Sequence, residues 1–260
     1  MKFIQSRDNT FFREIARLAG SARQRCKARR TLLDGAHLLA AYLDNGFRPL
    51  HILVSSTALS DAEVQALLGR ATDVPVTQLD DRLFAGLSEL KTPTGLLVLI
   101  ELPQPAAAVS HSHFALLLED IQDPGNLGSM LRSAAAAGCD AVFLSGGCAD
   151  VWSPKVLRAA MGGHFVLNIH EQQDLPDVAN AFPGMLLAAT LQATHNLYDC
   201  DLRGNVALLI GNEGAGLSVG LLSLATQTMS IPMPGKVESL NAAAAAAICL
   251  FEAVRQRQLC

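Results

Sequence analysis

Three short stretches in the second half of the sequence gather glycines and polar side chains in patterns that suit chemistry. They read DPGNLGSMLRSA (residues 123–134), IGNEGAGLS (residues 210–218) and IPMPGKVESLN (residues 231–241). Their candidate functional side chains are those of Asn126, Arg132, Glu213, Ser239 and Asn241. Amides, a hydroxyl, a carboxylate and a guanidinium can orient a substrate and stabilise charge that develops during a reaction.

The first stretch predicts a turn followed by a helix. Asp-Pro-Gly at 123–125 is a turn signal, and Asn126 is expected to cap a helix over residues 127–137. Arg132 lies about 1.7 helical turns beyond Asn126, so both can share the side of the helix at its entrance. Because its neighbours are apolar, we expect a mostly buried helix on which Arg132 needs a partner or a task. The alternative is that Asn126 only caps the helix and that Arg132 is only a surface charge.

The second stretch is a glycine-rich loop with one acidic residue. Its three glycines, Gly211, Gly214 and Gly216, allow the backbone to approach a ligand closely. The loop lacks the G-K-[ST] of a P-loop and does not follow the G-x-G-x-x-G pattern of dinucleotide-binding folds. On its own it is more typical of a strand-to-helix turn in which Glu213 supplies a first-turn charge.

The third stretch ends a strand and begins a helix. Ser239 is expected to cap this helix by accepting from the amide of residue 241 or 242, which places Asn241 in the first turn. The positive end of the helix dipole favours a carboxylate or a phosphate there. Six alanines, Ala242–Ala247, follow. We expect them to permit close approach to a cofactor, to other backbone or to a second subunit, so leucine at 244 or 245 should overpack the site.

Continuously apolar strands must position these stretches. Strands are predicted at residues 114–120, 141–145, 184–190, 206–211 and 228–233, with helices between them, notably over 126–138 and 239–257. Apolar runs of this kind are typical of a parallel sheet that is covered on both faces. Ligands of such α/β sheets bind beyond the carboxyl ends of the strands, where all three stretches lie.

The first half of the chain predicts a smaller α/β layer. Helices are expected over residues 8–20 and 31–46, and strands over 50–55, 74–79 and 94–102. Residues 102–112 (LPQPAAAVSHS) carry two prolines and no charge, which is typical of a linker. The sequence therefore predicts one domain at 1–101 and a second at 113–260.

Basic residues are concentrated near the start of the chain. The net charge is −4, but residues 1–30 hold nine basic and two acidic residues. The cluster RQRCKARR contains Arg23, Arg25, Lys27, Arg29 and Arg30. Such a block favours contact with RNA or DNA phosphates, and the alternative is a solvated helix face.

Several classes of protein are excluded or disfavoured. The sequence has no long uncharged apolar run, so no membrane span is predicted. The first residues lack the apolar core of a signal peptide, and a cytoplasmic location is therefore expected. The six cysteines form no C-x-x-C pair and the histidines show no ligand spacing, so we expect reduced thiols and no metal.

The three stretches, in this order, closely resemble the signature motifs of the SpoU (TrmH-type) family of RNA 2'-O-ribose methyltransferases, within the SPOUT superfamily. RQRCKARRTLLDGAHLLAAYLDNGFRPLHILVS (residues 23–55) resembles the L30e-like substrate-binding domain that precedes the catalytic domain in many members. In place of the Glu more usual in that domain, the sequence has LDGAHLL. The resemblance implies an α/β catalytic domain with a deep trefoil knot and a homodimer formed through that domain.

The resemblance also implies the cofactor S-adenosylmethionine and the residues of the site. The matching functional positions are Asn126, Arg132, Glu213, Ser239 and Asn241. The matching cofactor-binding positions are Thr190, Leu191, Gly211, Asn212, Ile231, Met233 and Leu240. Arg132 corresponds to the residue proposed as general base in the family. A guanidinium is normally locked in its charged form, so Arg132 can instead bind an RNA phosphate and stabilise the developing alkoxide.

The implied reaction is methylation of a ribose 2'-hydroxyl in structured RNA, with ribosomal RNA favoured over tRNA by analogy of fold. One alternative is an RNA-binding protein of the same fold that has lost catalysis. Another is a generic nucleotide-binding α/β protein, which explains the glycine loops but not the basic N-terminal segment.

Overall fold

The computed structural model describes residues 1–88, 93–105 and 109–258. The chain forms two compact units. Unit 1 consists of Met1–Pro103 and Trp152–Phe165, and unit 2 of Gln104–Val151 and Val166–Cys260. The contacts thus place Trp152–Phe165 in unit 1, although the prediction assigned all of residues 113–260 to a second domain.

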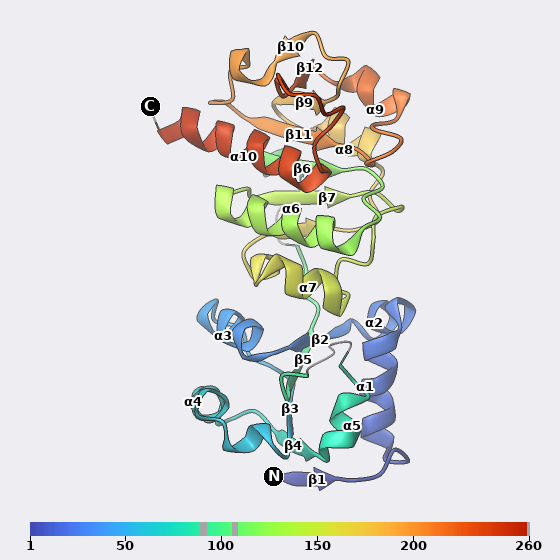
Figure 1. Cartoon of the computed structure of the whole chain (residues 1–260), viewed down its shortest axis with the longest axis vertical. Helices are drawn as coiled ribbons and strands as arrows, with labels where there is room; N and C mark the ends of the chain where they lie inside the picture. The colour runs from blue at the N-terminus through green and yellow to red at the C-terminus, as the bar shows by residue number, and fades with distance from the viewer. Residues whose placement is uncertain (89–92, 106–108, 259–260) are drawn as a thin grey trace. The chain divides into compact units, whose positions relative to one another are not determined.

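Unit 1 has a five-stranded mixed sheet in its described part, in the order β1-β4-β3-β5-β2 (Figure 1). The strands are β1 (Lys2–Ile4), β2 (Arg30–Asp34), β3 (His51–Ser55), β4 (Val76–Leu79) and β5 (Leu96–Glu101). β4 runs parallel to β1 and β3, whereas β5 runs antiparallel to β2 and β3. β3, β4 and β5 confirm the three strands predicted in this half.

Helices flank this sheet. They are α1 (Thr10–Gly20), α2 (Ala22–Ala28), α3 (Ala36–Asp44), α4 (Ala62–Arg70), α5 (Asp81–Ala85) and α7 (Pro154–Ala160), with short 3₁₀ turns η1 (Ala58–Ser60) and η3 (Gly163–Phe165). α1 confirms the predicted helix over 8–20. Its apolar face buries Phe12, Ile15 and Leu18, and the Asn9 side chain caps it by accepting from the amides of residues 11 and 12.

The prediction of one helix over residues 31–46 is wrong at its start. Residues 31–34 belong to β2, which pairs with β5 some 65 residues away along the chain. Gly35 has a φ of 110°, a conformation that a helix does not contain, and α3 begins only at Ala36. Apolar periodicity cannot reveal a strand whose partner is so distant, because the pairing is a tertiary effect.

The segment Trp152–Phe165 completes unit 1 beside β2 and α3. The Thr31 hydroxyl, which is fully buried, donates to the carbonyl of Trp152 at 2.8 Å. The ring of Phe165 lies 5.1 Å from that of Tyr42, edge to face. A side chain at Gly162 would press on Ala41. This docking could not be predicted from local sequence patterns, because the partners lie more than 100 residues apart.

Unit 2 has a seven-stranded sheet in the described residues, with the order β10-β12-β9-β11-β6-β7-β8 and every pairing parallel. The strands are β6 (Phe114–Leu118), β7 (Ala141–Leu144), β8 (Asn168–His170), β9 (Met185–Ala189), β10 (His195–Asn196), β11 (Val206–Ile210) and β12 (Gln227–Ser230). The five predicted strands and the parallel sheet are confirmed. β8 and β10 were missed because two or three residues carry too little apolar pattern.

The helices of unit 2 cover both faces of its sheet. They are α6 (Pro124–Ala137), α8 (Leu175–Ala181), α9 (Val219–Leu224) and α10 (Ala242–Gln258), with 3₁₀ turns η2 (Val109–His111) and η4 (Leu197–Asp199). α8 and α9 pack on the face that presents Leu117, Phe143 and Leu209. α6 and α10 lie side by side (Figure 1), with Ala134 of α6 and Ala246 of α10 fully buried.

Two expected helix caps are wrong. Asp123, not Asn126, caps α6: its carboxylate accepts from the amide of residue 126 at 2.7 Å, and Pro124 occupies the first turn. Asn241, not Ser239, caps α10: its side-chain oxygen accepts from the amides of Ala243 and Ala244 at 2.9 and 3.2 Å. The Asn126 side chain is therefore available for other contacts, whereas that of Asn241 is partly committed.

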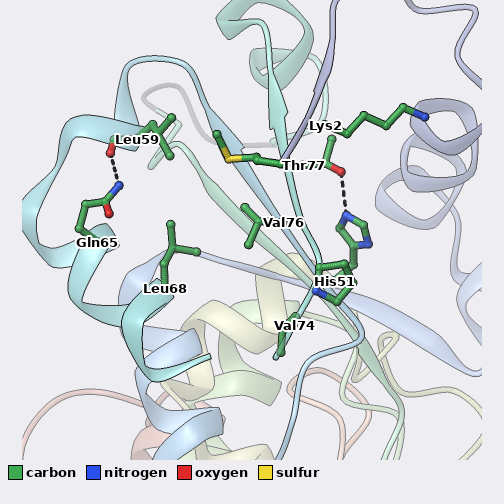
Figure 2. A pocket seen from close by; sticks show the side chains of 10 residues that line it. Lys2, His51, Leu59, Gln65, Leu68, Val74, Val76 and Thr77 are labelled. Atoms are coloured by element: carbon green, nitrogen blue, oxygen red, sulfur yellow. Dashed lines mark hydrogen bonds between the residues drawn. The ribbon is translucent and has the colours of Figure 1, made fainter. Parts of the chain in front are cut away.

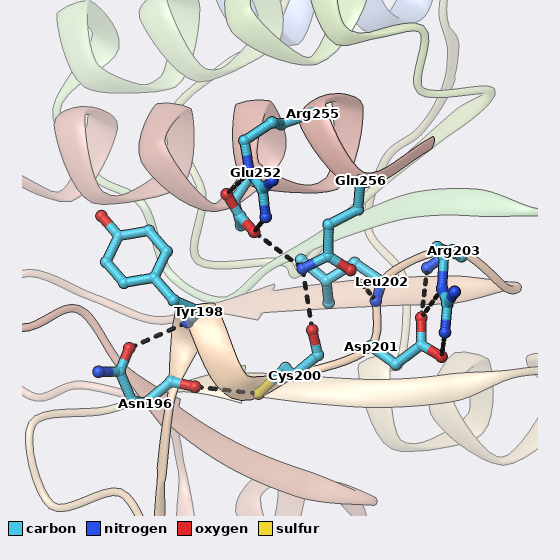
Figure 3. A network of polar contacts seen from close by, with 9 residues as sticks. All are labelled: Asn196, Tyr198, Cys200, Asp201, Leu202, Arg203, Glu252, Arg255 and Gln256. Carbon is cyan, nitrogen blue, oxygen red and sulfur yellow. Dashed lines mark hydrogen bonds and ion pairs between the residues drawn. The ribbon is translucent and has the colours of Figure 1, made fainter. Parts of the chain in front are cut away.

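The far end of α10 is anchored to the segment between β10 and β11 (Figure 3). The Gln256 side chain donates to the Cys200 carbonyl at 3.0 Å and accepts from the Leu202 amide at 2.9 Å. It also donates to Glu252, a carboxylate that is only 7% exposed and that pairs with Arg255 through two hydrogen bonds. These contacts fix the helix whose N-terminus is capped by Asn241.

Candidate active site

A pocket of about 340 Å³ lies at the carboxyl ends of β9, β11 and β12 and at the start of α10. Its lining includes all seven predicted cofactor-binding residues, Thr190, Leu191, Gly211, Asn212, Ile231, Met233 and Leu240, together with Glu213 and Ser239. β12, β9, β11 and β6 are neighbours in the parallel sheet, so the loops that follow them converge at one edge. Ligands of open α/β sheets bind beyond the carboxyl ends of the strands, as this pocket would require.

The glycine-rich stretch forms a tight loop that is closed by Asn212. The backbone groups of Asn212 and Gly216 exchange hydrogen bonds of 3.1 and 2.8 Å. The Asn212 side-chain oxygen accepts from the amides of Gly214 and Ala215 at 2.9 and 3.0 Å. A Cβ at Gly211 would overlap the backbone of Gly216, so only glycine permits this closure.

Three of the five predicted catalytic residues form one hydrogen-bonded chain. The Asn241 amide group donates to the side-chain oxygen of Asn126 at 2.9 Å, and the amide group of Asn126 donates to Glu213. The three residues come from α10, α6 and the loop after β11. Asn126 thus meets two motifs that lie 87 and 115 residues further along the chain.

The direction of this chain follows from the helix that it touches. The Asn241 oxygen must face the amides at the start of α10, so its NH₂ group must face Asn126. The oxygen of Asn126 is then occupied as an acceptor, and its NH₂ group points to the Glu213 carboxylate. The donors therefore run from the helix end towards a negative charge.

The other two predicted catalytic residues stand differently. Ser239 is exposed and lines the pocket. Arg132 is also exposed, which corrects the expectation of an arginine on a mostly buried helix. Among the described residues it makes no hydrogen bond or ion pair. Its guanidinium is therefore accessible from solvent.

Residues beyond the seven predicted cofactor-binding positions also line the pocket. Ala242 and Ala245 belong to the alanine run and face it, whereas Ala244 is exposed. Gln192 lines the pocket as well. Alanine-rich composition had indicated a close approach at this helix, but not which alanines make it, since that depends on the rotation of α10.

The basic segment of unit 1 divides into exposed and structural residues. Arg23, Lys27 and Arg29 are exposed, and Arg30 makes a 3.3 Å ion pair with Glu14. Arg25 departs from the prediction of RNA contact. It is only 6% exposed, and its guanidinium donates to the carbonyls of residues 18 and 19 at the end of α1.

A second, more open cavity of about 720 Å³ lies in unit 1 between α4 and the sheet (Figure 2). Its lining is mostly apolar, and the ring of His51 contacts the Thr77 hydroxyl at 2.8 Å. Partial burial lowers the pKa of His51. None of the predicted site residues lies there.

Within the described residues there is no cluster of three or more His, Cys, Asp or Glu side chains that could hold a metal ion. No helix in that part of the chain has the length and apolar character needed to cross a membrane.

Comparisons with known proteins agree with this geometry. The family model described as the SpoU rRNA Methylase family matches residues 113–251, and that of the MRM3-like substrate binding domain matches residues 9–98. An uncharacterized tRNA/rRNA methyltransferase of Synechocystis is 33% identical over 98% of this chain and 94% of its own length. The Bacillus subtilis 23S rRNA (guanosine(2553)-2'-O)-methyltransferase RlmP is 32% identical over 96% of this chain and 98% of its own.

A solved structure extends the agreement to three dimensions. The SpoU methyltransferase AviRb of Streptomyces viridochromogenes, crystallised with AdoMet, superposes with a TM-score of 0.85 at 29% identity. The alignment covers 97% of this chain and all of that one. Sequence match, fold and site geometry lead to one conclusion: this chain belongs to the SpoU rRNA methylase family.

Proposed function

We propose that this chain is an enzyme that transfers a methyl group from S-adenosylmethionine to a ribose 2'-hydroxyl of structured RNA, with ribosomal RNA favoured over tRNA. The observation that carries the proposal is the hydrogen-bonded chain Asn241–Asn126–Glu213 beside a pocket that is lined by the loops after β9, β11 and β12. Relatives named as rRNA methyltransferases support the choice of RNA.

The pocket fits S-adenosylmethionine in size and chemistry. Its volume of about 340 Å³ lies within the usual range of about 300–1,000 Å³ for small-molecule sites. Leu191, Ile231, Met233 and Leu240 offer apolar surface, and the backbone of the loop 211–216 can approach the ligand closely. When bound, the cofactor supplies a methyl group on a sulfonium, whose leaving group is a neutral thioether.

The chain's own residues then act by positioning and by electrostatics. Asn126, Asn241 and Glu213 form a directed polar chain that fixes the loops around the acceptor site. Ser239, exposed in the pocket wall, is available to bind the ribose. Because a guanidinium carries a fixed positive charge, we assign Arg132 to an RNA phosphate beside the target ribose, where it stabilises negative charge developing on the 2'-oxygen. The proton passes to phosphate or water.

Unit 1 supplies the RNA-binding surface in this proposal. Arg23, Lys27 and Arg29 present exposed positive charge, and the match to a substrate binding domain covers residues 9–98. The unit is proposed to be an L30e-like domain that carries structured RNA. Arg30 can bind an RNA phosphate only by giving up its ion pair with Glu14. Arg25 is not part of the RNA-binding surface, because its guanidinium donates to the carbonyls at the end of α1.

Further parts of the proposal concern assembly and location. We place a deep trefoil knot at the loops of unit 2 and a homodimer formed through that unit, in the cytoplasm. The exposure of Arg132, Glu213, Ser239 and Asn241 supports the dimer, because such a polar site functions best when a second subunit or the RNA shields it from water.

Calorimetry with S-adenosylmethionine and with ATP tests the cofactor, followed by transfer of labelled methyl from S-adenosylmethionine to unmodified rRNA and tRNA transcripts. We expect the protein to bind S-adenosylmethionine and not ATP. We expect the label on rRNA at nucleotides whose 3'-phosphodiester resists alkaline hydrolysis, because a 2'-O-methylated ribose lacks the hydroxyl that attacks it. Arg132→Ala should abolish transfer and leave cofactor affinity largely intact. Label on a base, ATP binding alone, or RNA binding without transfer would each reject the proposal.

A further inference from the structure

A strained residue lies directly before the first motif. Asp120, two residues past the end of β6, has a φ of 54°, in the left-handed region that non-glycine residues rarely adopt. Such a conformation is unfavourable for a non-glycine residue and persists where the surroundings fix it. Asp120 is exposed, so packing alone does not explain its conformation.

Ser145, which follows β7, fixes this conformation through two hydrogen bonds. Its hydroxyl accepts from the Asp120 amide at 2.9 Å and donates to the Asp120 carboxylate at 2.6 Å. A Cβ at Gly147 would collide with that carboxylate, so the loop after Ser145 closes around it. The amide of Ala149 also donates to the Ile121 carbonyl at 2.8 Å. The loop after β7 thus holds, through hydrogen bonds, the residues that precede the first motif (residues 123–134).

Asp120 also contacts the second motif (residues 210–218). The Asp120 carbonyl accepts from the Asn212 side chain at 2.9 Å. Because the Asn212 oxygen accepts from the amides of Gly214 and Ala215, only one orientation of its amide group satisfies all three contacts. The neighbouring Glu119 carboxylate accepts from the Ser218 amide at 2.7 Å, at the other end of the loop. Residues 119 and 120 therefore hold the loop that carries Glu213 at both ends.

We propose that Asp120 and Ser145 are positioning residues for methyl transfer, which rests on the proposed function. Ser145 locks Asp120 in its left-handed conformation, the Asp120 carbonyl orients Asn212, and Asn212 shapes the turn that presents Glu213 to Asn126. Neither Asp120 nor Ser145 lines the pocket. Their effect is transmitted through backbone geometry.

Four variants test this series of contacts from Ser145 through Asp120 and Asn212 to Glu213, called the relay below. Ser145→Ala removes both bonds to Asp120, and Asp120→Ala removes the side chain while disfavouring the left-handed backbone. Asp120→Asn keeps an acceptor oxygen and tolerates that backbone, so it should rescue. Ser223→Ala is the matched control, because its hydroxyl bonds only to the Gly220 carbonyl within α9.

Two measurements apply to all four variants. The first is steady-state kinetics: Ser145→Ala and Asp120→Ala should lower kcat by about tenfold or more with little change in KM for RNA, whereas Asp120→Asn and the control should match wild type. The second is hydrogen exchange of the peptide over residues 211–218, which should quicken in the two damaging variants only.

The two measurements separate the possible failures. Wild-type kcat and unchanged exchange in Ser145→Ala and Asp120→Ala overturn the relay. A wild type without methyl transfer refutes the proposed function, and the exchange data then still decide whether Asp120 and Ser145 hold the loop. Loss of activity in proportion to unfolded protein, measured by circular dichroism, would reduce the pair to a structural role and also overturn the inference.

Discussion

Replacement of Ala245 by leucine should obstruct the cofactor pocket selectively. Ala245 lines the pocket, whereas Ala244, the next residue of the same helix, is exposed. Both are alanines in the run that begins α10, and leucine is also a good helix former, so either substitution should leave the helix intact. The pair therefore separates pocket volume from helix propensity.

The magnitude follows from the extra volume. Leucine adds three carbon atoms to a pocket of about 340 Å³. Overpacking of a filled site costs about 1–3 kcal/mol, which corresponds to about a 5- to 150-fold higher Kd. We expect this increase for Ala245→Leu and a wild-type Kd for Ala244→Leu.

Isothermal titration calorimetry with S-adenosylmethionine measures both Kd values, and light scattering records the oligomeric state of each variant. If Ala245→Leu bound the cofactor as tightly as wild type, the pocket beside α10 would not be the cofactor site. If Ala244→Leu alone weakened binding, our placement of the helix face would be wrong.

Three further outcomes are expected. Replacement of Arg23 and Lys27 by glutamine should weaken RNA binding and reduce the slope of log K against log salt concentration by about one for each residue. Filter binding at several salt concentrations measures this slope. An unchanged slope would show that the two residues are not part of the RNA-binding surface. Glu252→Gln should lower the free energy of unfolding by about 1 kcal/mol in a denaturant titration, whereas Asp201→Asn in an exposed ion pair should change it little. Arg255 lowers the pKa of Glu252, so that stabilisation is present above the ordinary carboxyl pKa and disappears as the pH falls through the lowered one. Among the described cysteines, exposed Cys26 should react first with a thiol reagent, because burial raises the pKa of the buried thiols, to about 12 at Cys249; equal rates would contradict the described burial.

The sequence predicted the sheet of unit 2 and the convergence of its motifs for a physical reason. A parallel strand that is buried on both faces must be apolar throughout, and such runs are legible without a structure. The loops after them share one edge, so Asn126, Glu213 and Asn241 could be expected near one another. Their hydrogen-bond order could not, because it depends on which residue caps each helix.

Features that depend on competition between neighbouring residues escaped prediction. Asn126 and Ser239 looked like caps because their residue types suit that position, yet Asp123 and Asn241 take those places. Arg25 looked like part of a phosphate-binding block, but the end of α1 captures its guanidinium. In each case a local preference was correct in kind, and the competition between neighbouring residues decided the outcome.

The membership of Trp152–Phe165 in unit 1 has a consequence for synthesis of the protein. The N-terminal part of unit 1 ends at Pro103, but the segment that binds Thr31 and Tyr42 ends only at Phe165, about 60 residues later. At about 5–20 residues per second, the ribosome delivers it some 3–12 s afterwards. Unit 1 must therefore wait, without the segment that binds Thr31 and Tyr42, until Gln104–Val151 of unit 2 has been made. An N-terminal fragment that stops at the linker therefore lacks Trp152–Phe165, a part of its own unit.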